Sequence, residues 1–326
     1  MEPKAMTGFS CERTGVRMYQ TISTKNMSRE DWLSLRRTGI GGSDAGAICG
    51  LNPYSSPLDV YFNKTGEAPE TEDNEAMRQG RDLEEYVAKR FTEKTGLKVR
   101  RSNQMYRSAE HPFMIADVDR LIIGEDAGLE CKTANAFGAD QWKDGQIPVH
   151  YLLQCLHYMA VTGKKTWYIA VVILGMDFQY RKIVWGEKLI SNLIGIEEHF
   201  WNCYVTRGQM PEPDGTGAYT KALGAYFPIA KKGTKIPLIG FDEKLSRRDA
   251  ILEEMKALET EKSRIEQEVR CYMERNEAAI SERYRVSWPN IEINRLDTKR
   301  LRAEQPEVYQ QFLKKTTSRR FEITAA

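Results

Sequence analysis

Apolar and polar positions from residue 28 to residue 205 follow helical and strand patterns in turn. Helical spacing or helix-capping residues predict helices at 28–37, 44–49, 58–65, 74–95, 148–162 and 188–205. Strands are predicted at 97–107, 167–174 and 178–185, and a β-hairpin surrounds a turn at 124–128. Because 167–174 is almost continuously apolar, we expect it in the centre of the sheet. The fold class is therefore α/β, a mixed central sheet flanked by helices.

The segments outside this core differ from it in composition. Residues 1–27 are polar and aperiodic, which predicts a flexible N-terminal arm, and residues 206–240 are rich in Gly and Pro, which predicts a linker or long loop. Residues 241–326 form a C-terminal helical region with short strands. Its expected elements are a long helix or helical hairpin at 242–280, a strand at 284–293, a helix at 297–315 and a strand at 320–323. The apolar residues of the long helix favour packing on its own domain over an intermolecular coiled coil.

The predicted hairpin carries two acids and a lysine. Asp119 ends the apolar run before the turn, and Glu130 and Lys132 lie two positions apart in the following strand. Side chains alternate along a strand, so Glu130 and Lys132 share a face. With Asp119 alongside, two carboxylates and an ammonium group would suit a hard divalent cation such as Mg²⁺ and a phosphate substrate. The same trio fits an ordinary surface ion network, and spacing alone leaves both interpretations open.

A further carboxylate stands out on the helix predicted at 74–95. Glu84 falls within the apolar arc of that helix, whereas Glu85 falls outside it. A carboxylate on a buried face is costly unless it is paired or bound to a metal. Glu84 is therefore either a site residue or the partner of a buried arginine such as Arg81 or Arg36.

Two polar features flank the hairpin in sequence. A glycine pair at 41–42 leads into a helix with Ser43 as its N-cap, which predicts an anion-binding helix terminus or merely a capped turn. Tyr151, Gln154 and Tyr158 are spaced by three and four, so they share one helix face. That face either lines a cleft or forms a hydrogen-bonded edge of the core.

Composition narrows the classes of protein. The formal net charge is +2, so any nucleic-acid-binding surface must be local. From 281 to 326 there are ten Lys or Arg against six Asp or Glu, a mild basic excess. The six cysteines form no C-x-x-C pair, which indicates neither a zinc finger nor a disulfide framework. No signal peptide or membrane-spanning run is apparent, so we expect a cytoplasmic protein without membrane partners.

Five motifs carry a resemblance to a known family. They are R-R-T-G-I-G-G-S-D at 36–44, G-R-D-L-E at 80–84, D at 119, E-C-K at 130–132 and Q-C-L-H-Y-M-A-V-T-G at 154–163. In this order and spacing they resemble the YqaJ-type viral recombinase and lambda exonuclease group of the PD-(D/E)XK nuclease superfamily. The resemblance covers roughly residues 28–205 and implies a restriction-endonuclease-like core.

The resemblance implies a metal centre. Asp119, Glu130 and the backbone carbonyl of Cys131 would bind Mg²⁺, with Mn²⁺ as a substitute, and Lys132 would be the catalytic lysine. Glu84 would hold a second metal or its water. All five positions match motifs of the family in this sequence.

Further roles follow from the same resemblance. Gln154 would position the attacking water or the lysine, with Tyr151 nearby, and Arg36 and Ser43 match positions that contact a 5′-phosphate in lambda exonuclease. One departure is Asp117, which stands where lambda exonuclease has a serine. An added acid repels a phosphate, so it weakens the expectation of 5′-phosphate dependence and makes Asp117 a further candidate metal ligand.

The implied activity is a Mg²⁺-dependent deoxyribonuclease acting on double-stranded DNA ends. It would degrade one strand from the 5′ end and leave a 3′ overhang for phage-type homologous recombination. The family relation also implies a single-strand annealing protein as partner, a ring-shaped homo-trimer, and the cytoplasm of a bacterial host if the chain is phage-encoded. The alternatives are an endonuclease of the same superfamily and a non-catalytic DNA-binding or scaffold protein.

Overall fold

The structure is a computed structural model of the 326-residue chain, and it describes residues 18–68, 74–316 and 318–324. The chain divides into two compact units, Met1–Pro228 and Ile229–Ala326. Among the residues that the structure describes, no helix combines the length and apolar character needed to cross a membrane.

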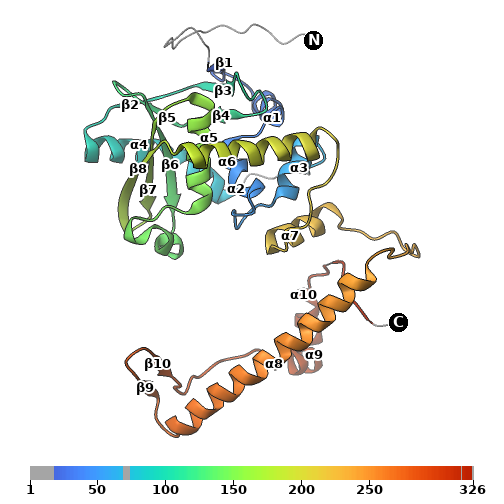
Figure 1. The fold of residues 1–326 in the computed structure, drawn as a ribbon. Helices are drawn as coiled ribbons and strands as arrows, with labels where there is room; N and C mark the ends of the chain where they lie inside the picture. Colours follow the sequence, from blue (N-terminus) through green and yellow to red (C-terminus); the bar gives the residue numbers. More distant parts are fainter. Residues whose placement is uncertain (1–17, 69–73, 317, 325–326) are drawn as a thin grey trace. The chain divides into compact units, whose positions relative to one another are not determined.

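A five-stranded mixed sheet forms the centre of the first unit (Figure 1). Its order is β2 (Val99–Arg101), β5 (Arg120–Ile122), β6 (Ala127–Ala134), β7 (Thr166–Ile173) and β8 (Asp177–Val184). Strands β6 and β7 are parallel, and the other pairs are antiparallel. The α/β class is therefore confirmed, and β7 is an inner strand whose residues are buried after its first position.

Helices cover both faces of this sheet. Alternation along β7 sends Tyr168 and Ala170 into one core with Phe91 of α4 (Glu75–Thr95), and Trp167 and Ile169 into the opposite core. That second core is shared with α5 (Val149–Thr162), against which α2 (Gly42–Ile48) and α6 (Glu187–Phe200) pack. The two helix layers hold β6, which carries the candidate site, in the interior of the domain.

A second sheet of three strands corrects two predictions. Its order is β1 (Tyr19–Ser23), β3 (Gln104–Ser108) and β4 (Ile115–Asp117). The predicted arm thus contains a strand, β1, which pairs with β3. The contact is reinforced by Tyr19, which packs edge-on against Tyr106 at 5.1 Å between ring centroids. Residues 1–17 of the arm lie outside the described residues. The predicted strand at 97–107 is two strands in different sheets, since Asn103 takes a positive φ of 50° between them.

Other helical segments differ from their expected extents. A 3₁₀ segment, η1 (Ala136–Gly145), precedes α5, and α6 continues as a π-helical turn, η2 (Trp201–Val205). The predicted linker contains α7 (Gly217–Tyr226), which is ordered by packing on α3 (Pro57–Thr65). The rings of Tyr226 and Phe62 stack there at 3.8 Å between centroids. The first helix, α1 (Arg29–Arg37), is capped by Ser28 as predicted.

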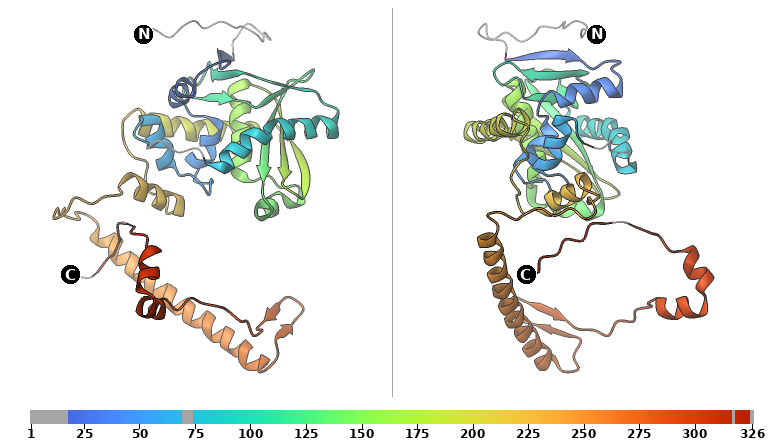
Figure 2. Two further views of the ribbon diagram at one scale, coloured as in Figure 1. Left: turned by 180° about the vertical axis from the view of Figure 1, so that it is seen from behind. Right: turned by 90° about the vertical axis from the view of Figure 1, so that its right-hand side faces the viewer.

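The second unit is built on the long helix α8 (Asp242–Met273), followed by the hairpin of β9 (Ala278–Ile280) and β10 (Arg285–Ser287) at its C-terminal end (Figure 2). The strand expected at 284–293 is therefore shorter than predicted and covers only Arg285–Ser287. The helix expected at 297–315 is split into α9 (Thr298–Glu304) and α10 (Pro306–Gln311), because proline disfavours helical backbone at the preceding Gln305. Within the described residues 318–324 there is no strand, so the strand predicted at 320–323 is wrong.

Candidate active site

The hairpin of β5 and β6 places Asp119 beside the acidic strand, as the spacing predicted. Asp119 lies between β4 and β5, and its Oδ2 accepts a hydrogen bond from the backbone N–H of Cys131 at 2.8 Å. Glu130 and Lys132 lie on either side of Cys131 in β6. One carboxylate from the loop is thereby fixed against the strand that carries the second carboxylate and the lysine.

Glu130 is the buried centre of this cluster, with 2% of its surface exposed. Its Oε1 accepts hydrogen bonds from Lys132 Nζ at 2.6 Å and from Gln154 Nε2 at 2.7 Å. Among the described atoms its Oε2 is buried and has no hydrogen-bond partner. Lys132 also lies over the ring of Tyr151, 4.6 Å from its centroid. The helix face of α5 that carries Gln154 and Tyr151 therefore meets the β6 site.

The electrostatics of the cluster show an excess of negative charge. Burial raises the pKa of Asp119 well above its ordinary value, and the carboxylates of Glu130 and Glu84 raise it further. For Lys132 burial would lower the pKa, but Glu130 and Asp119 outweigh it, so the pKa is raised overall. Lys132 is consequently a permanent cation at neutral pH, suited to donating hydrogen bonds and offsetting negative charge rather than accepting a proton.

The residues present fit a divalent cation. The unpartnered Oε2 of Glu130 is a buried oxygen that lacks a donor, and the mutual crowding of carboxylates is relieved by a bound cation. Within the described parts of the chain, no group of three or more His, Cys, Asp or Glu residues could hold a metal ion by itself. Two carboxylates and the carbonyl of Cys131 would thus leave several positions to water, which Mg²⁺ characteristically retains.

Glu84 lies near this centre but is engaged by an arginine. It forms an ion pair with Arg120, whose side chain is only 3% exposed and which also binds Glu85 at 3.0 Å and the carbonyl of Asp119 at 2.8 Å. Of the two alternatives for Glu84, the pairing with a buried arginine is therefore present. The arginine is Arg120 and neither of the two expected from the sequence, Arg81 and Arg36. A second-metal role for Glu84 stays a prediction.

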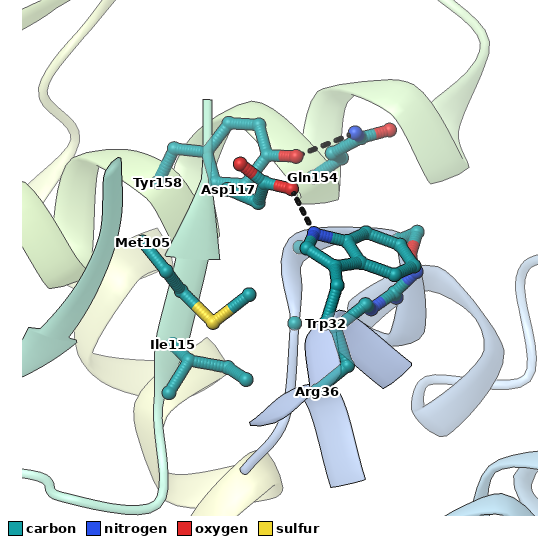
Figure 3. Close-up of a pocket in the computed structure, with 10 residues that line it drawn as sticks. Trp32, Arg36, Met105, Ile115, Asp117, Gln154 and Tyr158 are labelled. Carbon is teal, nitrogen blue, oxygen red and sulfur yellow. Dashed lines mark hydrogen bonds between the residues drawn. The ribbon is translucent and has the colours of Figure 1, made fainter. Parts of the chain in front are cut away.

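A cavity of about 190 Å³ adjoins the carboxylate centre (Figure 3). Its lining residues are Trp32, Arg36, Gly41, Gly42, Ser43, Met105, Ile115, Asp117, Gln154 and Tyr158. Gln154 belongs to both places, because its Nε2 donates to Tyr158 OH at 2.9 Å as well as to Glu130. The glycine turn, Arg36 and Ser43 are thus brought to the edge of the predicted metal site.

Arg36 is held in this cavity by Ser43 and by Asp44, which itself pairs with the buried Lys64. Its guanidinium donates to Ser43 Oγ at 2.7 Å and lies 3.6 Å from Asp44. Asp44 is bound in turn by Lys64 at 2.6 Å, and the Lys64 side chain is fully buried. Burial would raise the pKa of Asp44, but Lys64 and Arg36 lower it overall, so this carboxylate stays ionised. Sequence reasoning missed Lys64, whose basic character gave no sign of burial.

Asp117 faces the cavity and is held by a tryptophan. Its Oδ2 accepts a hydrogen bond from Trp32 Nε1 at 2.8 Å, a contact visible in Figure 3. Burial raises the pKa of Asp117, while the Trp32 hydrogen bond and the charge of Arg36 act in the opposite direction. An acid and a guanidinium therefore line the same cavity, and a metal-ligand role for Asp117 stays a prediction.

The fold and this site define an α/β domain with a carboxylate and lysine centre on an inner strand and, at its edge, a cavity lined by Arg36 and Asp117. Residues 31–165 match the family model for the YqaJ-like viral recombinase domain. The chain is 36% identical over 314 residues to the protein YqaJ of Bacillus subtilis (strain 168), a match that spans 95% of this chain and 98% of that protein. The chain belongs to the YqaJ family, which confirms the resemblance seen in its motifs.

Solved structures with a similar chain path include two exonucleases. The alkaline exonuclease LHK-Exo of Laribacter hongkongensis, in complex with dAMP, is 19% identical with a TM-score of 0.48, over 55% of this chain and 93% of that chain. A phage-related exonuclease from Haemophilus somnus 129PT is 13% identical with a TM-score of 0.39, over 55% of this chain and 100% of that chain.

Proposed function

We propose that the protein is a metal-dependent deoxyribonuclease that hydrolyses phosphodiester bonds of double-stranded DNA. The observation that carries the proposal is the convergence of Asp119, Glu130 and Lys132, with the buried Oε2 of Glu130 left without a partner. Mg²⁺ bound by the two carboxylates and the Cys131 carbonyl would act as a Lewis acid toward the phosphate, and Mn²⁺ would substitute.

The chain's own residues supply orientation and charge. Lys132 is cationic and fixed by Glu130 and by the Tyr151 ring, so its ammonium group can offset negative charge that develops on the phosphate oxygens. Gln154 and Lys132 both donate to the same oxygen of Glu130, which holds that carboxylate in one orientation. The backbone N–H of Cys131 does the same for Asp119. The two acids are therefore positioned before substrate arrives.

The cavity beside the centre supports attack at a DNA end. We propose a 5′-to-3′ exonuclease that leaves 3′ overhangs for recombination, with Arg36 and Ser43 as donors to the 5′-terminal group. Asp117 lines the same cavity, and its carboxylate opposes a phosphate dianion while it can accept a hydrogen bond from a hydroxyl. The preference for a 5′-phosphate should consequently be weak.

End-labelled linear duplexes with a 5′-phosphate or a 5′-hydroxyl, digested beside a covalently closed circle, test this proposal. We expect both linear duplexes to be degraded at rates within about tenfold and the circle to stay intact. Cutting of the circle would instead assign the endonuclease alternative. Tight DNA binding without cleavage in Mg²⁺ or Mn²⁺ would assign the non-catalytic alternative.

Two partner proposals follow from the family membership. The family is named for a viral recombinase domain, which supports a single-strand annealing protein as partner. We further propose a homo-trimer ring around DNA. Light scattering of the purified chain, with and without duplex DNA, measures the mass of the protein assembly directly. A mass of three chains supports the ring, and a monomer on DNA contradicts it.

A further inference from the structure

Helix α8 carries an apolar stripe with the spacing of a coiled-coil seam. Its members alternate in steps of four and three along the helix: Ile251, Met255, Leu258, Lys262, Ile265, Val269 and Tyr272. This is an a/d pattern sustained over three heptads, interrupted only by the lysine at an a position. The 32-residue helix is long enough, at roughly 48 Å, to present the whole stripe to one partner.

The sequence favoured packing of this stripe within its own domain. In the structure the stripe is instead exposed. The exposed fraction is 40% for Ile251, 65% for Leu258, 52% for Ile265 and 85% for Tyr272. Among the residues described between 229 and 326, only Met273 is buried. The apolar side chains of α8 therefore require an occupant that their own unit does not supply.

The charges that flank the stripe oppose pairing with a second copy of α8. The charged residues at the e and g positions between Leu252 and Tyr272 are all glutamates: Glu254, Glu259, Glu261, Glu266 and Glu268. A parallel pair brings g beside e of the other helix, and an antiparallel pair brings e beside e and g beside g, so two copies would oppose glutamate with glutamate either way. In parallel register Lys262 would also face its own counterpart.

We propose that α8 is the docking surface for an amphipathic helix of another protein, whose apolar seam is flanked by Lys or Arg and which carries an acid opposite Lys262. Such a partner complements the glutamates on both sides and gives the lysine a counter-charge. Within α8, Lys262 pairs with Glu259 at 2.8 Å and Arg270 with Glu266 at 3.4 Å. These exposed pairs contribute little to the stability of the helix, so they are readily exchanged for ion pairs across the interface.

Two synthetic helical peptides test the proposal against the full-length chain. Both carry the same Leu and Ile seam with one glutamate placed to face Lys262; the first has lysine and the second glutamate at its e and g positions. Fluorescence anisotropy should show the lysine peptide binding at least roughly tenfold more tightly. Replacing all five flanking glutamates, Glu254, Glu259, Glu261, Glu266 and Glu268, with lysine while keeping the seam intact should reverse this preference.

Single substitutions provide the controls. Leu258→Asp should abolish binding of the lysine peptide, whereas Thr260→Asp on the opposite face should leave it unchanged, with circular dichroism confirming equal helix content. The proposal is overturned if neither peptide binds, if the charge reversal does not change the preference, or if the chain forms a dimer that Leu258→Asp converts to a monomer. That last result would identify a second copy as the occupant.

Discussion

Replacing Gly42 with alanine tests how closely α2 must approach α5 beside the site. A Cβ at this position would lie 2.5 Å from Cε1 of Tyr158 and 2.9 Å from its Cζ. Carbon atoms in contact normally stay about 3.5 to 4.0 Å apart, so the ring would have to move by about 1 Å. Tyr158 is buried, and its ring packs on Trp167 at 5.4 Å between centroids. We therefore expect Gly42→Ala to lower the free energy of unfolding by about 1 to 3 kcal/mol.

The same displacement should reach the carboxylate centre. Tyr158 OH accepts the hydrogen bond of Gln154, and Gln154 donates to Glu130. A misplacement of about 1 Å in a positioning group can lower the rate of the chemical step by roughly 100-fold. Single-turnover cleavage of a labelled duplex measures this loss, and urea denaturation measures the stability change.

Gly195→Ala is the matched control. Gly195 lies in α6, and a Cβ there meets no atom within 4 Å. Since glycine costs a helix about 0.5 to 1 kcal/mol relative to alanine, this variant should be slightly more stable and cleave at the normal rate. The reasoning is refuted if Gly42→Ala matches the wild type in both stability and cleavage.

Two further predictions concern buried charges. Arg120→Gln removes the cation that pairs with Glu84 and should cost about 1 to 3 kcal/mol in urea denaturation, whereas Arg101→Gln at the surface should cost less than about 1 kcal/mol; equal losses would contradict this. Burial would lower the pKa of His157, but the Glu197 carboxylate raises it above 6.5 overall, and burial raises the pKa of Glu197 as well. The contribution of charged His157 to stability is then complete below about pH 6.5 and is lost as pH rises through its folded pKa. The melting temperature should fall more steeply from about pH 6 to about pH 9 in the wild type than in His157→Gln, and parallel curves would refute the assignment.

The local part of the candidate site was predictable from the sequence. Strand alternation put Glu130 and Lys132 on one face, and their 2.6 Å contact confirms it. The turn at 124–128 indicated that Asp119 would return beside the strand, which its bond to the Cys131 N–H confirms. Helical spacing likewise placed Gln154 and Tyr158 on one helix face, and their 2.9 Å hydrogen bond confirms it. These relations depend on neighbours within one or two elements, so periodicity captures them.

The parts that sequence reasoning missed depend on contacts between distant segments. Arg120 is buried because α4 brings Glu84 over β5 from 36 positions away, and nothing around Arg120 in the sequence marks it as buried. Lys64 is similar, since its partner Asp44 lies on another helix. Strand β1 pairs with a strand about 85 residues later, and α7 is stabilised by packing on α3 despite its glycines. Tertiary contacts outweighed local composition in each case.

Cleavage of an end-labelled linear duplex by Lys132→Met tests the central claim most directly. Lys132 is fixed against Glu130 in the buried centre, whereas Lys89 is 72% exposed on α4 and provides the matched variant Lys89→Met. In Mg²⁺ the wild type and Lys89→Met should degrade the duplex at equal rates, and chelation of the metal should stop both. Lys132→Met should be at least roughly 100-fold slower while remaining folded. Degradation at the wild-type rate by Lys132→Met, or undiminished cleavage after removal of the metal, would contradict the account.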